Sequence, residues 1–345
     1  MIPPRTIWII SEGSPGHVSQ STGLAAALAE KFPVETRQFE CRPKINGFVR
    51  HMIRLLGMRK NGRPLPDSLL YGPIGLERSQ PGESAPDLII SSGGRSVFAA
   101  RTLAVKFGVP FVFLGERKPY PPEWFHTVFT PSSLETAEND VRMDVIPTKI
   151  TPEEVHQAAA EWQNKPTGRL WSMLIGGKSR SHDFQDADWQ KLAEGMTALA
   201  KSENIRWLVT TSRRTGKDVE SKLRDLLPPE IIADAVWWCH QPEKKFPAYL
   251  GAAEAIWVTQ DSVSMVTEAV ATDKPVIVIQ PAHTPFPATS FMPGYLSNLE
   301  SLGLISRLPI ARLTEVNPDF LTNPRPTIKV TEIMAEQLCE RLNWN

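Results

Sequence analysis

Short runs of apolar residues alternate along the chain with longer segments in which apolar positions recur every three or four residues. The short runs are rich in Ile, Val and Phe, as in strands buried on both faces, and the longer segments have the period of amphipathic helices. This order is typical of βαβ units, so we predict an α/β fold with parallel sheets. The predicted strands are Ile7 to Ile10, Asp87 to Ser91, Pro110 to Leu114, Val128 to Phe129, Leu170 to Ile175, Trp207 to Thr211, Ala255 to Val258 and Pro275 to Ile279. The predicted helices are Ser19 to Lys31, Ser96 to Phe107, Asp186 to Lys201, Lys217 to Leu227, Ser262 to Ala271 and Val330 to Leu342.

The alternation occurs twice, and 345 residues are more than one ordinary core usually supports. We therefore predict two Rossmann-like domains, over residues 1–150 and 165–327. Between them, Pro147 to Gly168 is the predicted hinge, with one helix that begins after Pro152. The last helix, within residues 328–345, is expected to pack back on the first domain.

Composition narrows the range of partners and compartments. Lys plus Arg number 38, as do Asp plus Glu, so the overall charge gives no attraction to nucleic acid, and no such partner is expected. The three cysteines are odd in number and far apart, which favours a reducing compartment. Neither a signal peptide nor a run of about 18 apolar residues is evident, so we expect a cytoplasmic protein.

Residues 42–63 are locally basic, with no acidic residue, and their apolar positions have helical spacing. Two interpretations stay open. This segment forms a basic amphipathic helix that gives peripheral contact with the inner face of an anionic membrane, or it packs its apolar side on the first domain with its charges in solvent.

The first strand is followed by a glycine-containing turn that leads into a helix. It places Glu12, Gly16 and His17 at the carboxyl end of a parallel strand, where ligands bind in such folds. The alternative is a tight structural turn in which Ser19 caps the helix.

Three turns of the second half combine small, hydroxyl and basic residues in the same position after a strand. Glycines let the backbone approach a ligand, arginines bind diphosphate, and a helix start favours an anion, while a carboxylate such as Glu268 accepts hydrogen bonds from ribose hydroxyls. Ordinary capping and solvent-exposed charges are the alternative. The candidate nucleotide-binding residues are Gly176, Gly177, Lys178, Ser179, Ser212, Arg213, Arg214, Asp261, Ser262, Ser264, Met265 and Glu268, with Gly16 from the first half.

Several common motifs are missing from the sequence. The turn at Gly176 lacks P-loop spacing, and no G-x-S-x-G, H-E-x-x-H or G-x-G-x-x-G pattern follows a predicted strand. We therefore expect neither an ATPase, a hydrolase nor an oxidoreductase, and no metal site or cofactor is predicted.

The turns described above resemble the mitochondrial fission protein family first known from plants, most of whose members are bacterial. The resemblance spans nearly the whole chain and rests on the segments from Gly13 to Gln20, Ile175 to Gly177, Thr211 to Thr215 and Asp261 to Ala269. That family is similar to the GT-B glycosyltransferases. The resemblance therefore implies two facing Rossmann-like domains, with a nucleotide-diphosphate sugar, first of all a UDP-linked one, in the cleft between them. The chain departs from the family pattern around Gly115 to Pro119 and Thr130 to Ser133.

These inferences predict a metal-independent glycosyltransferase that transfers the sugar to a hydroxyl acceptor. In one form of this hypothesis the acceptor is lipid-linked. The candidate general bases are His17, Glu12 and Glu116. Two alternatives stay open: a non-hydrolysing epimerase of nucleotide sugars, which needs no acceptor, and a catalytically silent nucleotide-binding scaffold.

Overall fold

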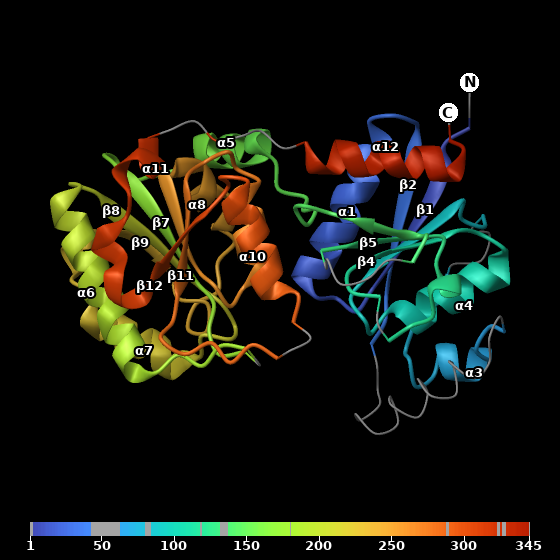
Figure 1. Ribbon diagram of the computed structural model, residues 1–345, viewed down its shortest axis with the longest axis horizontal. Helices are drawn as coiled ribbons and strands as arrows, with labels where there is room; N and C mark the ends of the chain where they lie inside the picture. Colours follow the sequence, from blue (N-terminus) through green and yellow to red (C-terminus); the bar gives the residue numbers. More distant parts are fainter. Residues whose placement is uncertain are drawn as a thin grey trace. The chain divides into compact units, whose positions relative to one another are not determined.

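The computed structural model describes residues 3–42, 63–79, 84–117, 119–131, 137–179, 181–287, 290–322, 325 and 329–344. The chain divides into two compact units (Figure 1). Unit 1 comprises Met1–Lys149 and Lys329–Asn345, and unit 2 comprises Ile150–Ile328. Each unit contains one six-stranded sheet, and the paired strands of both sheets are parallel. The α/β class predicted from the hydrophobic pattern is confirmed.

Unit 1 has the strand order β2-β1-β3-β4-β5-β6. Its strands are β1 (Arg5–Ser11), β2 (Val34–Glu40), β3 (Leu88–Ser92), β4 (Phe111–Leu114), β5 (Thr127–Thr130) and β6 (Asp140–Arg142). Its helices are α1 (Pro15–Ala29), α3 (Asp67–Leu70), α4 (Val97–Phe107), η1 (Pro122–Trp124) and α12 (Val330–Leu342).

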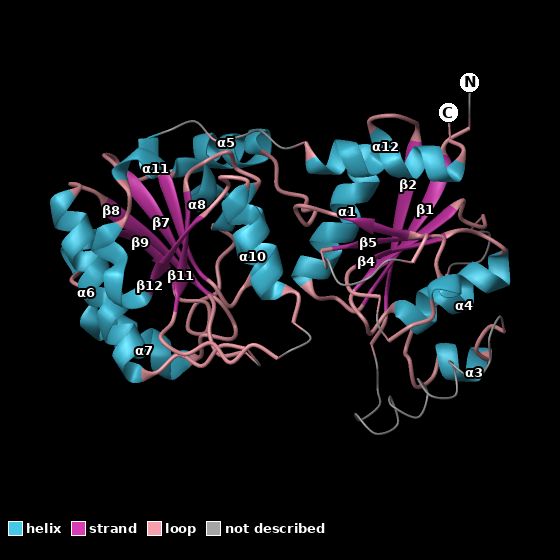
Figure 2. Cartoon of the chain, in the orientation of Figure 1, coloured by secondary structure: helices cyan, strands magenta, loops and turns pink. Residues whose placement is uncertain are grey.

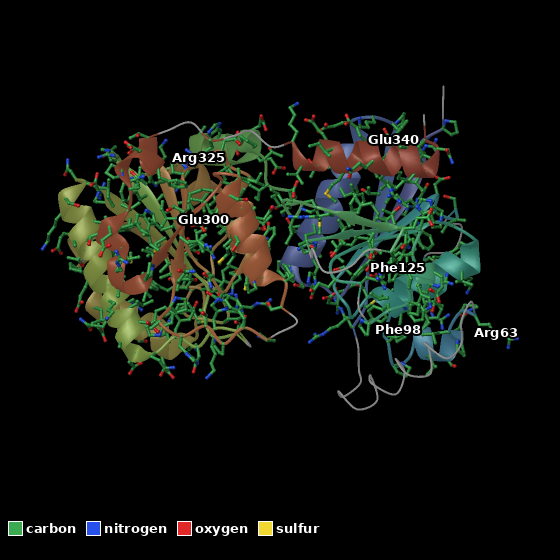
Figure 3. The ribbon with its side chains drawn as sticks, in the orientation of Figure 1. Arg63, Phe98, Phe125, Glu300, Arg325 and Glu340 are labelled. Atoms are coloured by element: carbon green, nitrogen blue, oxygen red, sulfur yellow. The ribbon has the colours of Figure 1, made fainter. Side chains whose placement is uncertain are left out.

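Successive side chains of each strand point to opposite sides of the sheet, and both sides are covered by helices. Trp8 and Ile10 of β1 belong to the core on the side of α4, together with Phe98 and Phe125, which Figure 3 labels. The opposite face is covered by α1 and α12 (Figure 2).

Helix α12 returns the chain to unit 1 after unit 2 is complete. The ring of Trp344, just after this helix, lies 4.1 Å from the guanidinium of Arg5 on β1 and 6.2 Å from the ring of Phe32. Lys31, just after α1, pairs with Glu336 at 3.3 Å. The two ends of unit 1 are therefore joined by ring contacts and an ion pair.

Unit 2 has the strand order β12-β11-β10-β7-β8-β9. Its strands are β7 (Leu170–Ile175), β8 (Arg206–Thr211), β9 (Ile232–Val236), β10 (Ala255–Thr259), β11 (Val276–Gln280) and β12 (Ser306–Pro309). Its helices are α5 (Pro152–Glu161), α6 (Asp186–Ser202), α7 (Lys217–Leu226), η2 (Pro229–Ile231), α8 (Phe246–Ala252), α9 (Val263–Val270), α10 (Met292–Ser301), η3 (Ile310–Glu315) and α11 (Pro318–Thr322).

The core of unit 2 is centred on three tryptophans from neighbouring strands. Trp171, Trp207 and Trp257 are almost completely buried, and their ring centroids lie 5.7 to 6.0 Å apart. They share one core with side chains of α6 and α7, and α8 and α10 lie on the other side of the sheet (Figure 2). These large rings make the centre of the sheet rigid, so its strand ends are well-defined supports for loops.

In each sheet the strand order reverses beside the unit's first strand, which is β1 in unit 1 and β7 in unit 2. At such a point the connections from two neighbouring strands leave toward opposite faces and open a crevice at the carboxyl ends. The turns after β1 and β3, and those after β7 and β10, therefore lie where other folds of this kind bind ligands.

One predicted helix boundary is wrong. Helix α1 begins at Pro15, not at Ser19, because proline at the first helical position has its φ already set and lacks an N–H that would need a partner. Ser19 is buried inside the helix, where its hydroxyl contacts Thr148 Oγ1 at 2.9 Å. His17 therefore lies in the first helical turn.

The elements that were not predicted from the sequence are β2, β6, β9, β12, α3, α8, α10, α11 and the short helices η1, η2 and η3. The four strands lie at or next to the sheet edges and carry polar or half-buried residues, so they lack a continuous apolar run.

The predicted basic amphipathic segment 42–63 lies almost entirely outside the described residues. Within the part of the chain that the structure describes, no helix is both long and apolar enough to cross a membrane.

Candidate functional site

The turn after β7 and the turn after β10 are joined at the reversal point of unit 2. Gly176 N–H donates to Thr259 Oγ1 at 2.7 Å, and Gly177 N–H donates to Asp261 Oδ2 at 2.9 Å. A Cβ atom on Gly176 would overlap the Asp261 carboxylate, and one on Gly177 would overlap the backbone of Arg214. Both glycines are needed because other groups of the protein approach their backbone, and both N–H groups already have partners inside unit 2.

Asp261 is the centre of this arrangement. Its side chain is 0% exposed, and its carboxylate also accepts from Thr259 Oγ1 at 2.7 Å and pairs with the Arg214 guanidinium at 2.8 Å. Burial raises the pKa of the Asp261 carboxyl, while Arg214, Thr259 and the Gly177 N–H act against that shift. The carboxylate therefore connects three strand-end turns through one buried charge.

The turn after β8 is held to the turn after β7 by hydroxyl groups. Ser212 Oγ donates to Gly176 O at 3.0 Å, and Thr215 Oγ1 donates to the same carbonyl. Ser212 N–H in turn donates to Thr215 Oγ1 at 2.9 Å. Thr215 was not predicted as a site residue, although it is the buried hydroxyl that fixes the arginine-bearing turn.

The basic residues of these turns differ in their freedom. Arg213 is exposed and has no ion-pair partner among the described residues, whereas Arg214 is paired with Asp261. Lys178 is also exposed, and its amine pairs with Asp183 at 3.1 Å. Arg213 is thus the arginine of this pair whose charge is open to an anion.

Helix α9 begins directly after Asp261, with Ser262 at its N-cap position. The first bond of the helix runs from Val266 N–H to Ser262 O at 3.0 Å, which leaves the N–H groups of Val263, Ser264 and Met265 without intrahelical acceptors. The Ser262 side chain does not cap the helix, and its hydroxyl lies 3.5 Å from Ser264 Oγ. Half-buried Glu268 follows in the next turn of α9.

A buried histidine that the sequence did not single out adjoins these turns. His182 is 0% exposed, its Nε2 lies 3.1 Å from Gln260 Nε2, and its Nδ1 lies 3.0 Å from Ser181 Oγ and 3.3 Å from Ser179 Oγ. Burial, with the nearby Arg214 charge, lowers the pKa of His182 to about 4. His182 is therefore a neutral hydrogen-bonding residue at neutral pH, and the predicted Ser179 belongs to its network.

Unit 1 holds a second cluster at its own reversal point. His17 Nδ1 lies 2.6 Å from Glu12 Oε1; the imidazole is 38% exposed and the carboxylate only 8%. Ser92 Oγ, at the end of β3, donates to His17 O at 2.5 Å. Next to it, Gly93 has φ +83, and a Cβ atom there would overlap the His17 ring. Glu12 Oε2 is buried and has no hydrogen-bond partner among the described residues.

Because a carboxylate can only accept a hydrogen bond, the proton lies on Nδ1 of His17, which donates it to Glu12. The other ring nitrogen, Nε2, is left for other partners. The structure thus brings Glu12 and His17 into contact, with the carboxylate buried and the imidazole partly exposed. Gly16 lies beside them in the first turn of α1. Glu116 follows β4, the next strand after β3, and partial burial raises the pKa of its carboxyl.

Across the described residues, no group of three or more His, Cys, Asp or Glu side chains is arranged to hold a metal ion. The candidate residues gather instead into two sets, one at the carboxyl edge of each sheet.

A family model described as Mitochondrial fission ELM1 matches residues 15–342 of the chain. The protein belongs to the mitochondrial fission ELM1 family. This confirms the family resemblance of its turns. No curated protein matches the sequence.

Solved structures share the fold of this ELM1-family chain at low sequence identity. UDP-GlcNAc 2-epimerase of Methanocaldococcus jannaschii, in complex with UDP-GlcNAc and UDP, has a TM-score of 0.54 and 12% identity, over 97% of this chain and 99% of that one. S. aureus MnaA with UDP has a TM-score of 0.55 and 11% identity, over 99% and 98%. The kitacinnamycin glycotransferase has a TM-score of 0.51 and 14% identity, over 99% and 93%. The ELM1-family chain therefore has the GT-B-like α/β fold that was predicted.

Proposed function

We propose that unit 2 binds a nucleotide-diphosphate sugar and that the protein transfers the sugar to a hydroxyl acceptor. The observation that carries this proposal is the joining of the turns after β7, β8 and β10 around Asp261. This connection gathers the Arg213 turn and the start of α9 at the reversal point of one parallel sheet, where such folds bind ligands.

The chemistry of this edge suits a diphosphate. Arg213 supplies an unpaired guanidinium, and the first N–H groups of α9 point a partial positive charge away from the helix. In this proposal Glu268, on the same helix, accepts hydrogen bonds from the ribose hydroxyls. Lys178 leaves its exposed ion pair with Asp183 and binds the phosphates instead. Gly176 and Gly177 act through their small size, since their N–H groups have partners inside the unit.

The shared fold supports the same proposal. The archaeal epimerase was solved with UDP-GlcNAc and UDP, and MnaA with UDP, so a UDP-linked sugar is the first ligand to test. No cofactor or metal has a role in the proposal: Arg213 and the start of α9 would stabilise the departing diphosphate electrostatically.

For the transfer step, His17 is the proposed general base and Glu12 the residue that orients it. Nε2 of His17 would take the proton of the acceptor hydroxyl as its oxygen forms the new bond to the sugar and the bond to the diphosphate breaks. Nδ1 would keep its proton on the Glu12 side throughout. Glu116 is the alternative base from the same sheet edge.

Nucleotide binding is tested with a thermal-shift panel of UDP-, GDP-, CMP- and ADP-linked sugars. A ligand at 100 times its Kd adds about 2.7 kcal/mol of stability, which is easily measured. Arg213→Ala and Glu268→Ala should weaken the response, and Arg224→Ala, on the last turn of α7, is the matched control. Absence of a shift with every nucleotide sugar contradicts the proposal.

An epimerase is the second candidate because the UDP-GlcNAc 2-epimerase of Methanocaldococcus jannaschii matches the chain along nearly its full length. Incubation of the protein with UDP-GlcNAc alone, followed by chromatography of the sugars, separates the two reactions. A new sugar epimer formed without acceptor supports the epimerase, whereas product that needs a membrane extract supports transfer. Binding without either product indicates a nucleotide-binding scaffold.

A further inference from the structure

A second carboxylate–histidine pair lies in unit 2, on residues that the proposed reaction does not use. Glu220 of α7 is 0% exposed, and His240 Nδ1, in the turn after β9, lies 2.8 Å from Glu220 Oε2. The geometry repeats the His17–Glu12 pair of unit 1, with the carboxylate again on Nδ1. Neither residue stood out in the sequence, because they are 20 residues apart and belong to no motif.

Both oxygens of the Glu220 carboxylate accept hydrogen bonds. Its Oε1 accepts from Thr211 Oγ1 at 2.5 Å and from Cys239 N–H at 2.9 Å, while Oε2 accepts from His240. Burial acts to raise the pKa of this carboxyl, but the hydrogen bonds outweigh burial and leave the pKa lowered. Glu220 is thus a fixed negative charge beneath the imidazole.

The pair also sets the orientation of the imidazole ring. Since the carboxylate can only accept, Nδ1 of His240 carries a proton, and Nε2 is the nitrogen on the other side of the ring. The His240 side chain is 32% exposed, and no partner for Nε2 is found among the described residues. Burying a carboxylate costs free energy. A function for Nε2, the free nitrogen of the histidine that this carboxylate orients, would account for that cost.

The turn that carries His240 adjoins the Arg213 turn. Cys239 Sγ approaches the backbone carbonyls of Ser212 and Arg213 at 3.6 and 3.8 Å, which joins the turn after β9 to the Arg213 turn. The charged residues on the elements that hold this turn are Glu220, which contacts the imidazole, Lys217 at the start of α7, which acts on Cys239, and Arg213, whose backbone carbonyl Cys239 approaches. Since Glu220 is buried, the two cationic residues on these neighbouring elements favour an anion over a cation.

We propose that protonated His240, oriented by Glu220, contacts the phosphate groups of the nucleotide sugar beside Arg213. His240 is the binding residue, and Glu220 is a positioning residue that stabilises the imidazolium. This inference rests on the proposed nucleotide-sugar site, and it adds a property that the site otherwise lacks. A neutral imidazole whose Nδ1 proton faces Glu220 cannot donate from Nε2, so the contact requires the imidazolium and affinity is expected to be lower at higher pH.

The test uses UDP-GlcNAc as probe, because its diphosphate is esterified at both ends and has no ionisation near neutral pH. Its Kd is measured by calorimetry on the full chain at about pH 5.5 and about pH 8. We expect binding about fivefold weaker at the higher pH, the size of a partly exposed charge-assisted hydrogen bond. In His240→Gln the two Kd values should be equal, and in Glu220→Gln binding at about pH 5.5 should be weaker than in the wild type.

His156→Gln is the matched control because this histidine lies on α5, far along the chain from the strand-end turns. It should keep the wild-type profile, and thermal melts verify that each variant is folded. If His240→Gln binds the probe with the wild-type pH dependence, the inference is wrong while the proposed function stands. If wild type binds no nucleotide sugar at any pH, both the proposed function and the inference fail.

Discussion

The guanidinium of Arg214 lies 2.8 Å from Oδ2 of Asp261, and that carboxylate oxygen also accepts the Gly177 N–H. Asp261 is completely buried, whereas Arg214 is 39% exposed, so the pair places its negative end inside unit 2 and its positive end at the surface. A buried charge with one partner removed is costly, but an exposed arginine regains water. The stability of the site should therefore depend more on Asp261 than on Arg214.

Asp261→Asn should lower the free energy of unfolding by about 2 kcal/mol, because an amide cannot accept from Gly177, Thr259 and Arg214 at once. Urea unfolding followed by tryptophan fluorescence measures this change, since the core of unit 2 contains four buried tryptophans, Trp171, Trp189, Trp207 and Trp257. Asp183→Asn removes the partner of Lys178 at an exposed position and should change stability by less than about 0.5 kcal/mol. Equal effects of the two substitutions would contradict the central role of Asp261.

Gly176→Ala should destabilise unit 2 by about 2 kcal/mol or more, because its Cβ would overlap the Asp261 carboxylate and force the two turns apart. The matched control is Gly294→Ala on α10, where a Cβ meets nothing within 4 Å and alanine favours the helix by about 1 kcal/mol. The two alanines should thus move the urea midpoint in opposite directions. A neutral Gly176→Ala would show that the turns do not depend on this close approach.

The pKa of His182 makes unit 2 sensitive to acid. Its folded value of about 4 is below its ordinary value of 6.5, so the neutral ring contributes stability that is complete above about pH 6.5 and is lost as the pH falls toward 4. Between about pH 7 and pH 4.5 this contribution falls by about 2 kcal/mol. In His182→Gln that part of the acid sensitivity should disappear, whereas exposed His283→Gln should retain it. Urea unfolding at the two pH values provides the comparison.

The central strands and long helices follow from the sequence because burial on both faces imposes uninterrupted apolar runs. Strand β7 and helix α12 have the bounds predicted for them, Leu170–Ile175 and Val330–Leu342. Strand β2 was missed because the edge position lets Val34–Glu40 carry several charged residues. The pattern therefore predicts the layers of the fold better than its edges.

The turns that carry the candidate site were also found from the sequence, because each follows a buried strand. Which groups meet there was not predictable. Gly177 and its acceptor Asp261 are 84 residues apart, and only the adjacency of β7 and β10 brings them together. The same adjacency shows that the glycine N–H groups have protein partners. Local composition alone had suggested that they were open to a ligand. His182 belongs to no motif and so did not stand out in the sequence, although in the structure it hydrogen-bonds Gln260 and Ser181.

The hydrogen bond between Glu12 and His17 separates two roles that the sequence left open. If Glu12 were the base, its free oxygen would need access to solvent, but Oε2 is buried. The exposed group of the pair is the imidazole, so for the proposed transfer His17 is the better candidate for the base, and Glu12 is the candidate for the residue that fixes its tautomer.

His17→Ala should therefore lower the rate of sugar transfer by about 10²- to 10⁴-fold, which is the usual contribution of a general base. Glu12→Gln should cost less, because the imidazole stays in place while its orientation and basicity change. Nucleotide-sugar affinity, measured separately by calorimetry, should be unchanged in both variants, since the nucleotide site is assigned to unit 2. If Glu116→Gln instead abolishes transfer while His17→Ala retains it, the base is the carboxylate after β4, and the pair at the end of β1 is structural.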